Sequence, residues 1–166
     1  MSQARVGADG VLGFAGARYR AALGRGGLTA EKREGDGATP LGVWPMRRLL
    51  WRPDRGGDPV TGLQTLPIRP NDGWCDAPGD PNYNRPVPLP YPASAEHLWR
   101  DDGIYDLIVV LGHNDDPPVS PMGSAIFLHL ARPDYAPTEG CVALARRDLE
   151  ALLSRARLGD VLEIVG

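Results

Sequence analysis

The hexapeptide Ala125-Ile126-Phe127-Leu128-His129-Leu130 carries five apolar side chains and one imidazole. Short apolar runs that are rich in branched and aromatic residues are typical of strands buried on both faces. The run Tyr105-Asp106-Leu107-Ile108-Val109-Val110-Leu111 has the same character. The two runs therefore predict two buried strands at the centre of a β-rich fold.

Shorter patterns on either side of these runs extend the sheet. Residues Val11–Phe14 and Ala17–Leu23 predict the two strands of a hairpin that turns at Gly16. Residues Val43–Met46 predict the start of a further strand, and Gly159–Val165 predict a turn followed by a closing strand. The chain therefore offers strands from its beginning to its end.

Helices are expected to be few, because the sequence holds 21 glycines and 17 prolines. Asp148–Arg157 predicts one helix, since its leucines follow helical spacing. Ser94–Arg100 predicts a second, shorter helix with Ser94 as its N-cap.

The length of 166 residues predicts one domain over residues 1–166. Residues 52–94 are rich in proline and predict a long, irregular but ordered loop system. Long loops that carry aromatic side chains often form the walls of binding sites. Trp74 and Tyr83 are therefore candidates for substrate binding.

The net charge of −3 and the sequence pI near 5.6 argue against nucleic-acid and anionic-membrane partners, which need a concentrated basic face. No run approaches the roughly 18 apolar residues that a membrane span requires. Residues 1–27 lack the pattern of a secretory signal, which predicts a cytoplasmic protein. A periplasmic location would follow if an export signal had been removed.

Cys141 is the candidate nucleophile, because Gly140 before it allows the backbone to approach a substrate. The amides of these two residues could then face a developing oxyanion. His129 ends an apolar run twelve residues upstream and is the candidate base. This arrangement suits acyl transfer.

Simpler interpretations remain open for each of these residues. Cys141 could be a small buried apolar side chain, and His129 could be a hydrogen-bonded core histidine. His113 follows another strand and is the second candidate for the base, lining the same cleft. Cys75 is expected to be a buried free thiol. The spacing of histidines and cysteines indicates no metal site, and no cofactor is expected.

The sequence carries two motifs. The first joins Gly123-Ser124-Ala125-Ile126-Phe127-Leu128-His129 to Thr138-Glu139-Gly140-Cys141, and the second is Thr39-Pro40-Leu41-Gly42-Val43-Trp44. Together they resemble the L,D-transpeptidase (YkuD-like) catalytic domain. The resemblance implies a mainly β fold of two packed mixed sheets with one or two short helices, and a Cys–His site in a cleft under a mobile flap.

The resemblance also implies roles for individual residues. Cys141 would attack the L,D peptide bond of a peptidoglycan stem peptide, with His129 as base and then as acid. Ser124 and Thr138 would shape the site, and the Cys141 amide with a neighbouring amide, that of Gly140, would form the oxyanion hole. No cofactor is implied.

Two positions depart from the family pattern. Glu139 and Ala143 stand where relatives commonly have a basic and a polar residue, so the substrate carboxylate must be recognised elsewhere. The candidates for that role are Arg132, Arg146 and Arg147.

Three functions follow, in this order. The expected cytoplasmic location favours an L,D-carboxypeptidase of peptidoglycan recycling, which converts stem tetrapeptide to tripeptide and D-Ala. The alternative is an L,D-transpeptidase that forms cross-links through the same acyl-enzyme. A wall-binding module without activity comes third. Either enzyme is expected to be acylated by a carbapenem at Cys141.

Overall fold

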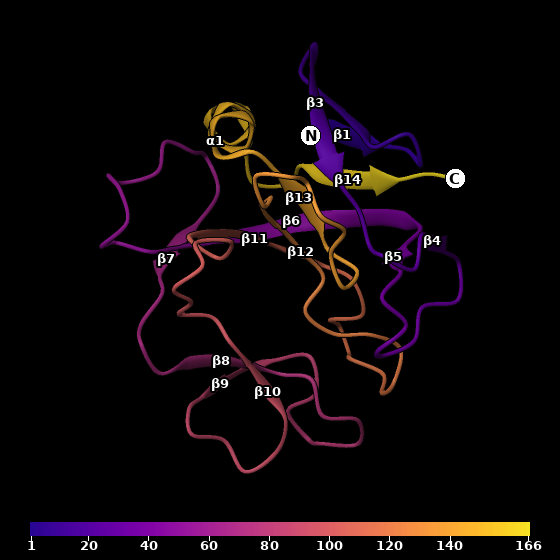
Figure 1. Cartoon of the computed structure of the whole chain (residues 1–166), viewed down its shortest axis with the longest axis vertical. Helices are drawn as coiled ribbons and strands as arrows, with labels where there is room; N and C mark the ends of the chain where they lie inside the picture. The colour runs from indigo at the N-terminus through magenta and orange to yellow at the C-terminus, as the bar shows by residue number, and fades with distance from the viewer.

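The computed structural model describes residues 1–166, and nine strands form its main sheet (Figure 1). Their order is β11-β12-β13-β3-β2-β1-β14-β6-β7, and a further pairing of β11 with β6 closes the circuit. The strands are β1 (Gln3–Val6), β2 (Val11–Phe14), β3 (Ala17–Ala22), β6 (Gly42–Trp51), β7 (Thr65–Pro67), β11 (Leu107–Leu111), β12 (Phe127–Leu130), β13 (Val142–Leu144) and β14 (Val161–Ile164).

Two strands of this closed sheet, β6 and β3, change pairing partner along their length. The first part of β6, Gly42–Pro45, pairs with β14, and its second part, Met46–Trp51, pairs with β11. Strand β3 pairs with β2 and also with β13. The pairings β1–β14, β12–β13 and β6–β7 are parallel, and the others of this sheet are antiparallel. The prediction of a mainly β fold with mixed sheets is confirmed.

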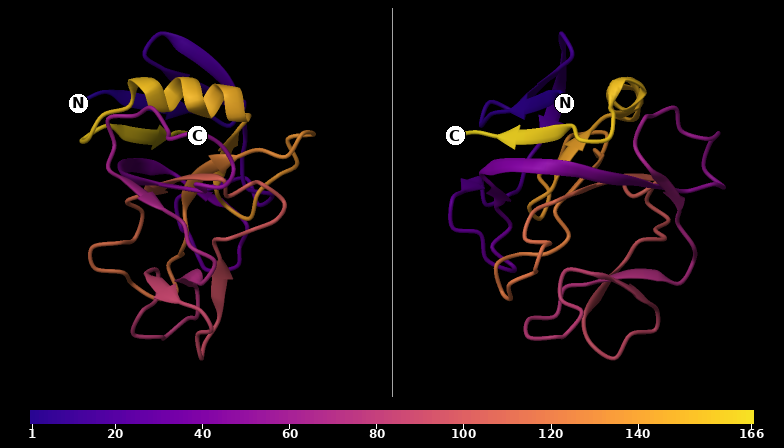
Figure 2. Two further views of the ribbon diagram at one scale, coloured as in Figure 1. Left: turned by 90° about the vertical axis from the view of Figure 1, so that its left-hand side faces the viewer. Right: turned by 180° about the vertical axis from the view of Figure 1, so that it is seen from behind.

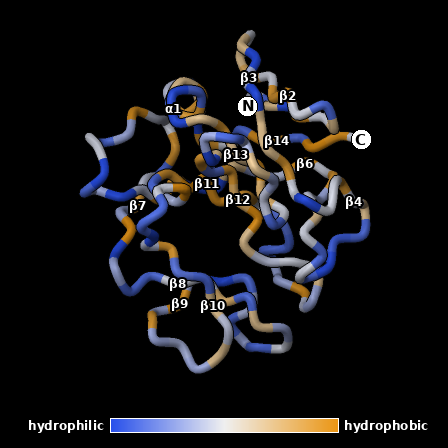
Figure 3. The backbone as a smooth tube through the Cα atoms, viewed as in Figure 1, coloured by the Kyte–Doolittle hydropathy of each residue, from blue (hydrophilic) through white to orange (hydrophobic).

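The central strands are buried on both faces, as their apolar runs predict. In β11, Val109 belongs to the main core of 23 buried residues, whereas Ile108 belongs to a second cluster of ten. Successive side chains of a strand point to opposite faces, so each strand serves both clusters. Figure 3 shows this concentration of apolar residues along β11, β12 and β13.

The predicted hairpin is present as β2 and β3. Ala15 and Gly16 form its two-residue turn with φ angles of 49° and 82°. Positive φ at both turn positions matches the twist that short antiparallel hairpins require. The sequence pattern therefore located this turn at the correct residue.

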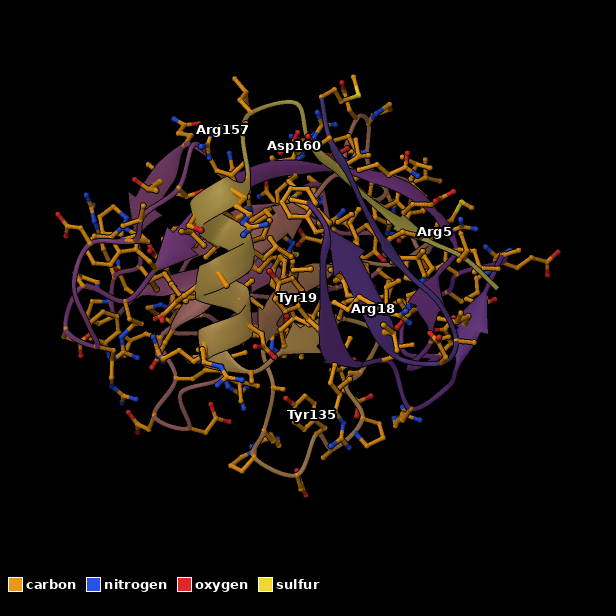
Figure 4. The ribbon with its side chains drawn as sticks, turned by 90° about the horizontal axis from the view of Figure 1, so that it is seen from above. Arg5, Arg18, Tyr19, Tyr135, Arg157 and Asp160 are labelled. Atoms are coloured by element: carbon orange, nitrogen blue, oxygen red, sulfur yellow. The ribbon has the colours of Figure 1, made fainter.

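The predicted helix near the end of the chain is α1 (Arg146–Arg155), which begins and ends two residues earlier than expected. Its residues Leu149, Leu152 and Leu153 pack into the main core. Figure 2 shows α1 lying over the sheet, and Figure 4 shows Arg157 and Asp160 beyond one of its ends. No helix is long and apolar enough to cross a membrane.

The prediction of a helix over Ser94–Arg100 is wrong. Ala95–His97 form a strand, β10, in a small sheet of order β10-β8-β9, with β8 (Asp72–Cys75) and β9 (Pro86–Pro88). Glu96 lies opposite Trp74 in this pairing. Cross-strand pairing outweighs the weak local preference for a helix here. The proline-rich segment thus carries short strands, and β4 (Leu28–Thr29) pairs with β5 (Thr39–Pro40) elsewhere.

Candidate active site

Strands β12 and β13 position the two reactive side chains. Their parallel register sets Leu128 beside Val142 and His129 beside Ala143. Cys141 directly precedes β13, and its Sγ lies 3.4 Å from the amide nitrogen of Phe127, which donates to it. Because alternate residues share a face, the side chains of Cys141 and His129 lie on the same face of adjacent strands.

Both side chains line a cavity of about 440 Å³, called here the Cys141 cavity. Cys141 is 7% exposed and His129 is 5% exposed. The cavity wall is unusually rich in charge for so small a space. Its charged residues are Lys32, Glu34, Asp76, Glu96, Arg100, Arg132 and Glu139.

The resting form of Cys141 is the thiol. Its Sγ donates a hydrogen bond to the carbonyl oxygen of Ala125 at 3.2 Å. Burial raises the pKa of the thiol to about 12, and the charge of Glu96 adds to this, while the Phe127 amide and Lys32 act in the opposite direction. The nucleophile therefore needs a base at the moment of attack.

His129 is suited to be that base. Its Nδ1 lies 3.0 Å from the carbonyl oxygen of Leu130. A carbonyl oxygen only accepts, so Nδ1 carries the proton and Nε2 offers its lone pair. Burial lowers the pKa of His129 to about 4, although the Leu130 carbonyl favours the charged ring. The Ile104 backbone is a second partner that favours the charged ring, but burial outweighs both, so the imidazole is neutral near pH 7, the form that can accept a proton.

The turn before Cys141 leaves one of the two expected oxyanion amides available. The Gly140 amide donates to Thr138 Oγ1 at 3.1 Å, and that hydroxyl donates to the Cys141 carbonyl oxygen at 2.6 Å. The Cys141 amide donates to no backbone acceptor. Gly140 has a φ of +134°, and a Cβ there would lie 2.8 Å from the Ala38 carbonyl oxygen. Gly140 therefore shapes the turn, while the Cys141 amide has no acceptor in the protein and remains available to an oxyanion.

Ser124 and Tyr83 act together on one carboxylate. The Ser124 hydroxyl donates to Glu34 Oε2 at 2.8 Å, and the Tyr83 hydroxyl donates to the same oxygen. Tyr83 also accepts the Gly123 amide at 2.9 Å and is buried outside the cavity. The aromatic ring of Tyr83 is therefore not a substrate platform: its hydroxyl fixes Glu34 in the cavity wall.

Trp74 likewise lies behind the site. Its ring packs edge-on against Phe127 with centroids 5.1 Å apart, and its Nε1 donates to Asn84 Oδ1 at 3.0 Å. The same oxygen accepts the Ala125 amide, while Asn84 Nδ2 donates to the carbonyls of His113 and Asn114. Asn84, which the sequence did not single out, thus supports the backbone whose carbonyl binds the thiol.

His113 does not line the Cys141 cavity. Its ring packs edge-on against Trp44 with centroids 4.7 Å apart, and burial together with the charge of Lys32 lowers its pKa to about 4. The structure therefore brings His129, and not His113, into the cavity with Cys141.

The candidate arginines divide between two cavities. Arg132 lines the Cys141 cavity and also an adjoining cavity of about 660 Å³. Arg146 lines only the adjoining cavity, where it binds Asp106 at 2.9 Å. Arg147 is exposed and lines neither. Arg132 is thus the one predicted arginine at the site, joined there by Arg100.

Glu96 and Tyr105 are further site residues that sequence reasoning missed. The Tyr105 hydroxyl donates to Glu96 Oε1 at 3.1 Å, and its ring lies edge-on to His129 with centroids 5.2 Å apart. Burial raises the pKa of Glu96 to about 7, against the effect of the Tyr105 hydrogen bond. Tyr105 stood at the start of a recognised strand, but Glu96 stood in the segment mistaken for a helix.

The two positions that depart from the family pattern, Glu139 and Ala143, lie at or near the cavity. Glu139, where relatives commonly have a basic residue, forms an ion pair with Arg25 at 2.8 Å. Ala143 lies in the cavity wall beside His129. Cys75 and Cys141 are both free and buried. No group of three or more His, Cys, Asp or Glu side chains is arranged to hold a metal ion.

Comparison with known proteins identifies the family. The model of the YkuD family, the L,D-transpeptidase catalytic domain, matches residues 13–164. Searches of curated proteins and of solved structures found no match. The family match spans both motifs, the helix and every strand from β3 to β14, so the chain belongs to the YkuD family of L,D-transpeptidase catalytic domains.

Proposed function

We propose that this protein is an L,D-carboxypeptidase that removes the terminal D-Ala from peptidoglycan stem tetrapeptides. The observation that supports it most is the placement of a thiol, a neutral imidazole and an unpaired backbone amide around one small cavity. These are a nucleophile, a base and an oxyanion donor, the groups that acyl transfer needs.

In the proposed reaction, His129 Nε2 takes the Cys141 proton as Sγ attacks the carbonyl carbon on the L side of the L,D bond. The Cys141 amide donates to the resulting oxyanion. The tetrahedral intermediate collapses when His129 returns the proton to the departing amine of D-Ala, which leaves a thioester. Water, deprotonated by His129, then attacks the thioester and releases the tripeptide and the thiol.

The size of the cavity supports hydrolysis over cross-linking. A volume of about 440 Å³ suits one small ligand. Arg100 and Arg132 in its wall both pair with Asp102, and a carboxylate of a stem peptide would bind them by replacing or sharing that partner. Hydrolysis needs only a water molecule as the second substrate, and so it needs no further binding space.

The adjoining cavity favours the alternative, an L,D-transpeptidase. It shares Ile104 and Arg132 with the Cys141 cavity. Its wall includes the carboxylate of Asp134, which would suit the ammonium group of an acceptor peptide, whereas Asp102 and Asp106 already pair with Arg132 and Arg146. An amine bound there could replace water in the second step.

Product analysis separates the two reactions. The purified protein is incubated with a disaccharide tetrapeptide and, separately, with intact wall, and the products are identified by mass spectrometry. The carboxypeptidase proposal expects tripeptide and D-Ala alone. Cross-linked dimer as the main product would overturn it in favour of the transpeptidase.

Two further experiments test the nucleophile. Cys141→Ala is expected to abolish turnover of the tetrapeptide. A wall-binding module would instead show no turnover with either residue and would bind the wall equally well with cysteine or alanine. A carbapenem is expected to acylate Cys141, because its strained amide meets the same nucleophile. The adduct is sought by intact-mass spectrometry, with the Cys141→Ala variant as control.

The proposed setting is peptidoglycan recycling in the cytoplasm, where soluble tetrapeptides would be the substrates. Fractionation of cells that express the protein, followed by immunoblotting, tests this setting. Recovery in the periplasmic fraction would contradict it and favour a role on the wall itself.

A further inference from the structure

Lys32 is the only lysine of the chain, among 18 lysines and arginines in total. It is 6% exposed, although lysines are almost never buried without a partner that requires them. It also lines the Cys141 cavity. The only lysine of the chain is thus buried in the same cavity as the nucleophile, which indicates a role at this site.

The Lys32 side chain is directed to the turn that carries the nucleophile. Its stem packs against Gly123, where a Cβ would lie 2.8 Å from Lys32 Cγ. Its Nζ lies 3.3 Å from the point that a Cβ on Gly140 would occupy. The ammonium group therefore lies next to Gly140, the residue before Cys141, close to the position that a side chain of residue 140 would occupy.

The loop that carries Lys32 is attached to the same turn. The amide of Arg25 donates to the Thr138 carbonyl oxygen at 2.8 Å, and the Thr138 amide donates to the Leu23 carbonyl oxygen at 2.9 Å. Residues 24 and 138 also form a β-bridge. The start of the loop that carries Lys32 is thus bonded to Thr138, three residues before the nucleophile.

Asp36 fixes the ammonium group in place. It forms an ion pair with Lys32, and its carboxylate also accepts the amides of Ala38 at 2.9 Å and Arg33 at 2.8 Å. Burial acts to raise the pKa of Asp36, but these hydrogen bonds leave it lowered overall. The carboxylate stays ionised, so a charged Lys32 has a preorganised partner.

We propose that the Lys32 ammonium is a catalytic group that stabilises the negative charge formed at Cys141, first on the sulfur and then on the substrate oxyanion. It adds a positive charge to a site in which the Gly140 amide is occupied by Thr138 Oγ1 and the Cys141 amide has no acceptor in the protein. Preorganised positive charge that is largely buried is effective for this purpose. The inference rests on the proposed acyl transfer.

The electrostatics of the thiol agree with this assignment. The charge of Lys32 lowers the pKa of Cys141, in opposition to burial and to Glu96. His113 lies beside Lys32 at Gly123 and is neutral near pH 7, because burial and the charge of Lys32 both lower its pKa to about 4. His113 therefore adds no second positive charge beside the ammonium group.

The test uses Lys32→Met, which keeps the length of the stem and removes the charge. Alkylation of Cys141 by iodoacetamide is followed by peptide mass spectrometry between about pH 6 and pH 10, and kcat and KM are measured with the tetrapeptide. We expect kcat to fall about 10²-fold with KM within about threefold, and the pH dependence of alkylation to move to higher pH. Arg33→Met, which removes an exposed charge from the same loop, is the matched control.

Two more variants separate catalysis from loop stability. Lys32→Met with Asp36→Asn removes both partners of the ion pair and is expected to keep the defect of Lys32→Met. Lys32→Arg retains a cation and is expected to recover at least tenfold of the lost kcat. Thermal melting of every variant reports on folding.

The outcomes are distinct. Parent-like rates and an unchanged alkylation profile in a folded Lys32→Met would overturn the inference, as would recovery in the double variant, because the ammonium would then only neutralise Asp36. A parent protein that cleaves no tetrapeptide would contradict the carboxypeptidase proposal alone, since alkylation tests Lys32 without a peptide.

Discussion

On one side of the Cys141 cavity, the nucleophile and the base stand at adjacent parallel strands whose neighbours are buried on both faces. On the other side, Asp76 and Glu96 extend from a small sheet whose strands are three or four residues long. The ladder of the nine-stranded sheet holds the first side, whereas a small three-stranded ladder and side-chain hydrogen bonds hold the second. We call the first the sheet side and the second the loop side. We expect the sheet side to determine the rate of the reaction and the loop side to determine its pH dependence.

The largest expected effect is on the sheet side, in His129→Gln. Glutamine keeps an N–H donor for the Leu130 carbonyl but cannot take a proton from the thiol. We expect kcat to fall about 10³-fold, about 4 kcal/mol in activation free energy, with little change in the free energy of unfolding. Steady-state kinetics and chemical denaturation measure the two quantities. A variant with near-parent activity would show that the base lies elsewhere.

The second effect concerns Asn84, which joins the loop side to the sheet side. Asn84→Ala leaves Trp74 Nε1 and the Ala125 amide without their shared acceptor. Buried unpaired groups of this kind are costly, so we expect a loss of about 3 kcal/mol in the free energy of unfolding. Urea denaturation measures it, with exposed Asn82→Ala as control. Equal losses in both variants would contradict the role assigned to Asn84.

The third effect belongs to the loop side alone. The pKa of Glu96 is raised from 4.5 to about 7, so the protonated form contributes stability that is present below about pH 4.5 and is lost as the pH rises through about 7. Glu96→Gln stays neutral. We expect it to be more stable than the parent by about 2 kcal/mol at about pH 8, and equal to it at about pH 4.5.

Denaturation at the two pH values tests this prediction, with exposed Glu31→Gln as control. Removing the Glu96 charge is also expected to speed alkylation of Cys141, because that charge raises the pKa of the thiol. A stability difference that is the same at both pH values would exclude the titration of Glu96 as its cause.

The smallest effect returns to the sheet side. Thr138→Val removes the hydroxyl that links the Gly140 amide to the Cys141 carbonyl. Because the strands on either side remain paired, we expect a loss of only about 1 kcal/mol in stability and a decrease in kcat of less than about tenfold. Thr138→Ser should restore both. A larger loss would mean that the turn, more than the ladder, positions the nucleophile.

The difference between the two sides of the Cys141 cavity also explains which residues the sequence could predict. The apolar runs of β11 and β12 have a periodic signal that survives without tertiary information, and the motif ending at Cys141 marks the nucleophile. Glu96 has no such signal, because its strand exists only through pairing with β8. Lys32 stood in a charged, glycine-rich segment that predicts a turn, yet its being the single lysine was visible in the composition.

The closed circuit of strands has a consequence for biosynthesis. Strand β14, at Val161–Ile164, lies between β1 and β6 and completes the ring. A nascent chain therefore carries both reactive residues outside the ribosome before the ring can close. Until Val161–Ile164 emerge, β1 lacks its parallel partner and the first part of β6 lacks its antiparallel one, so the ring around the two reactive residues closes only after β14 has been made.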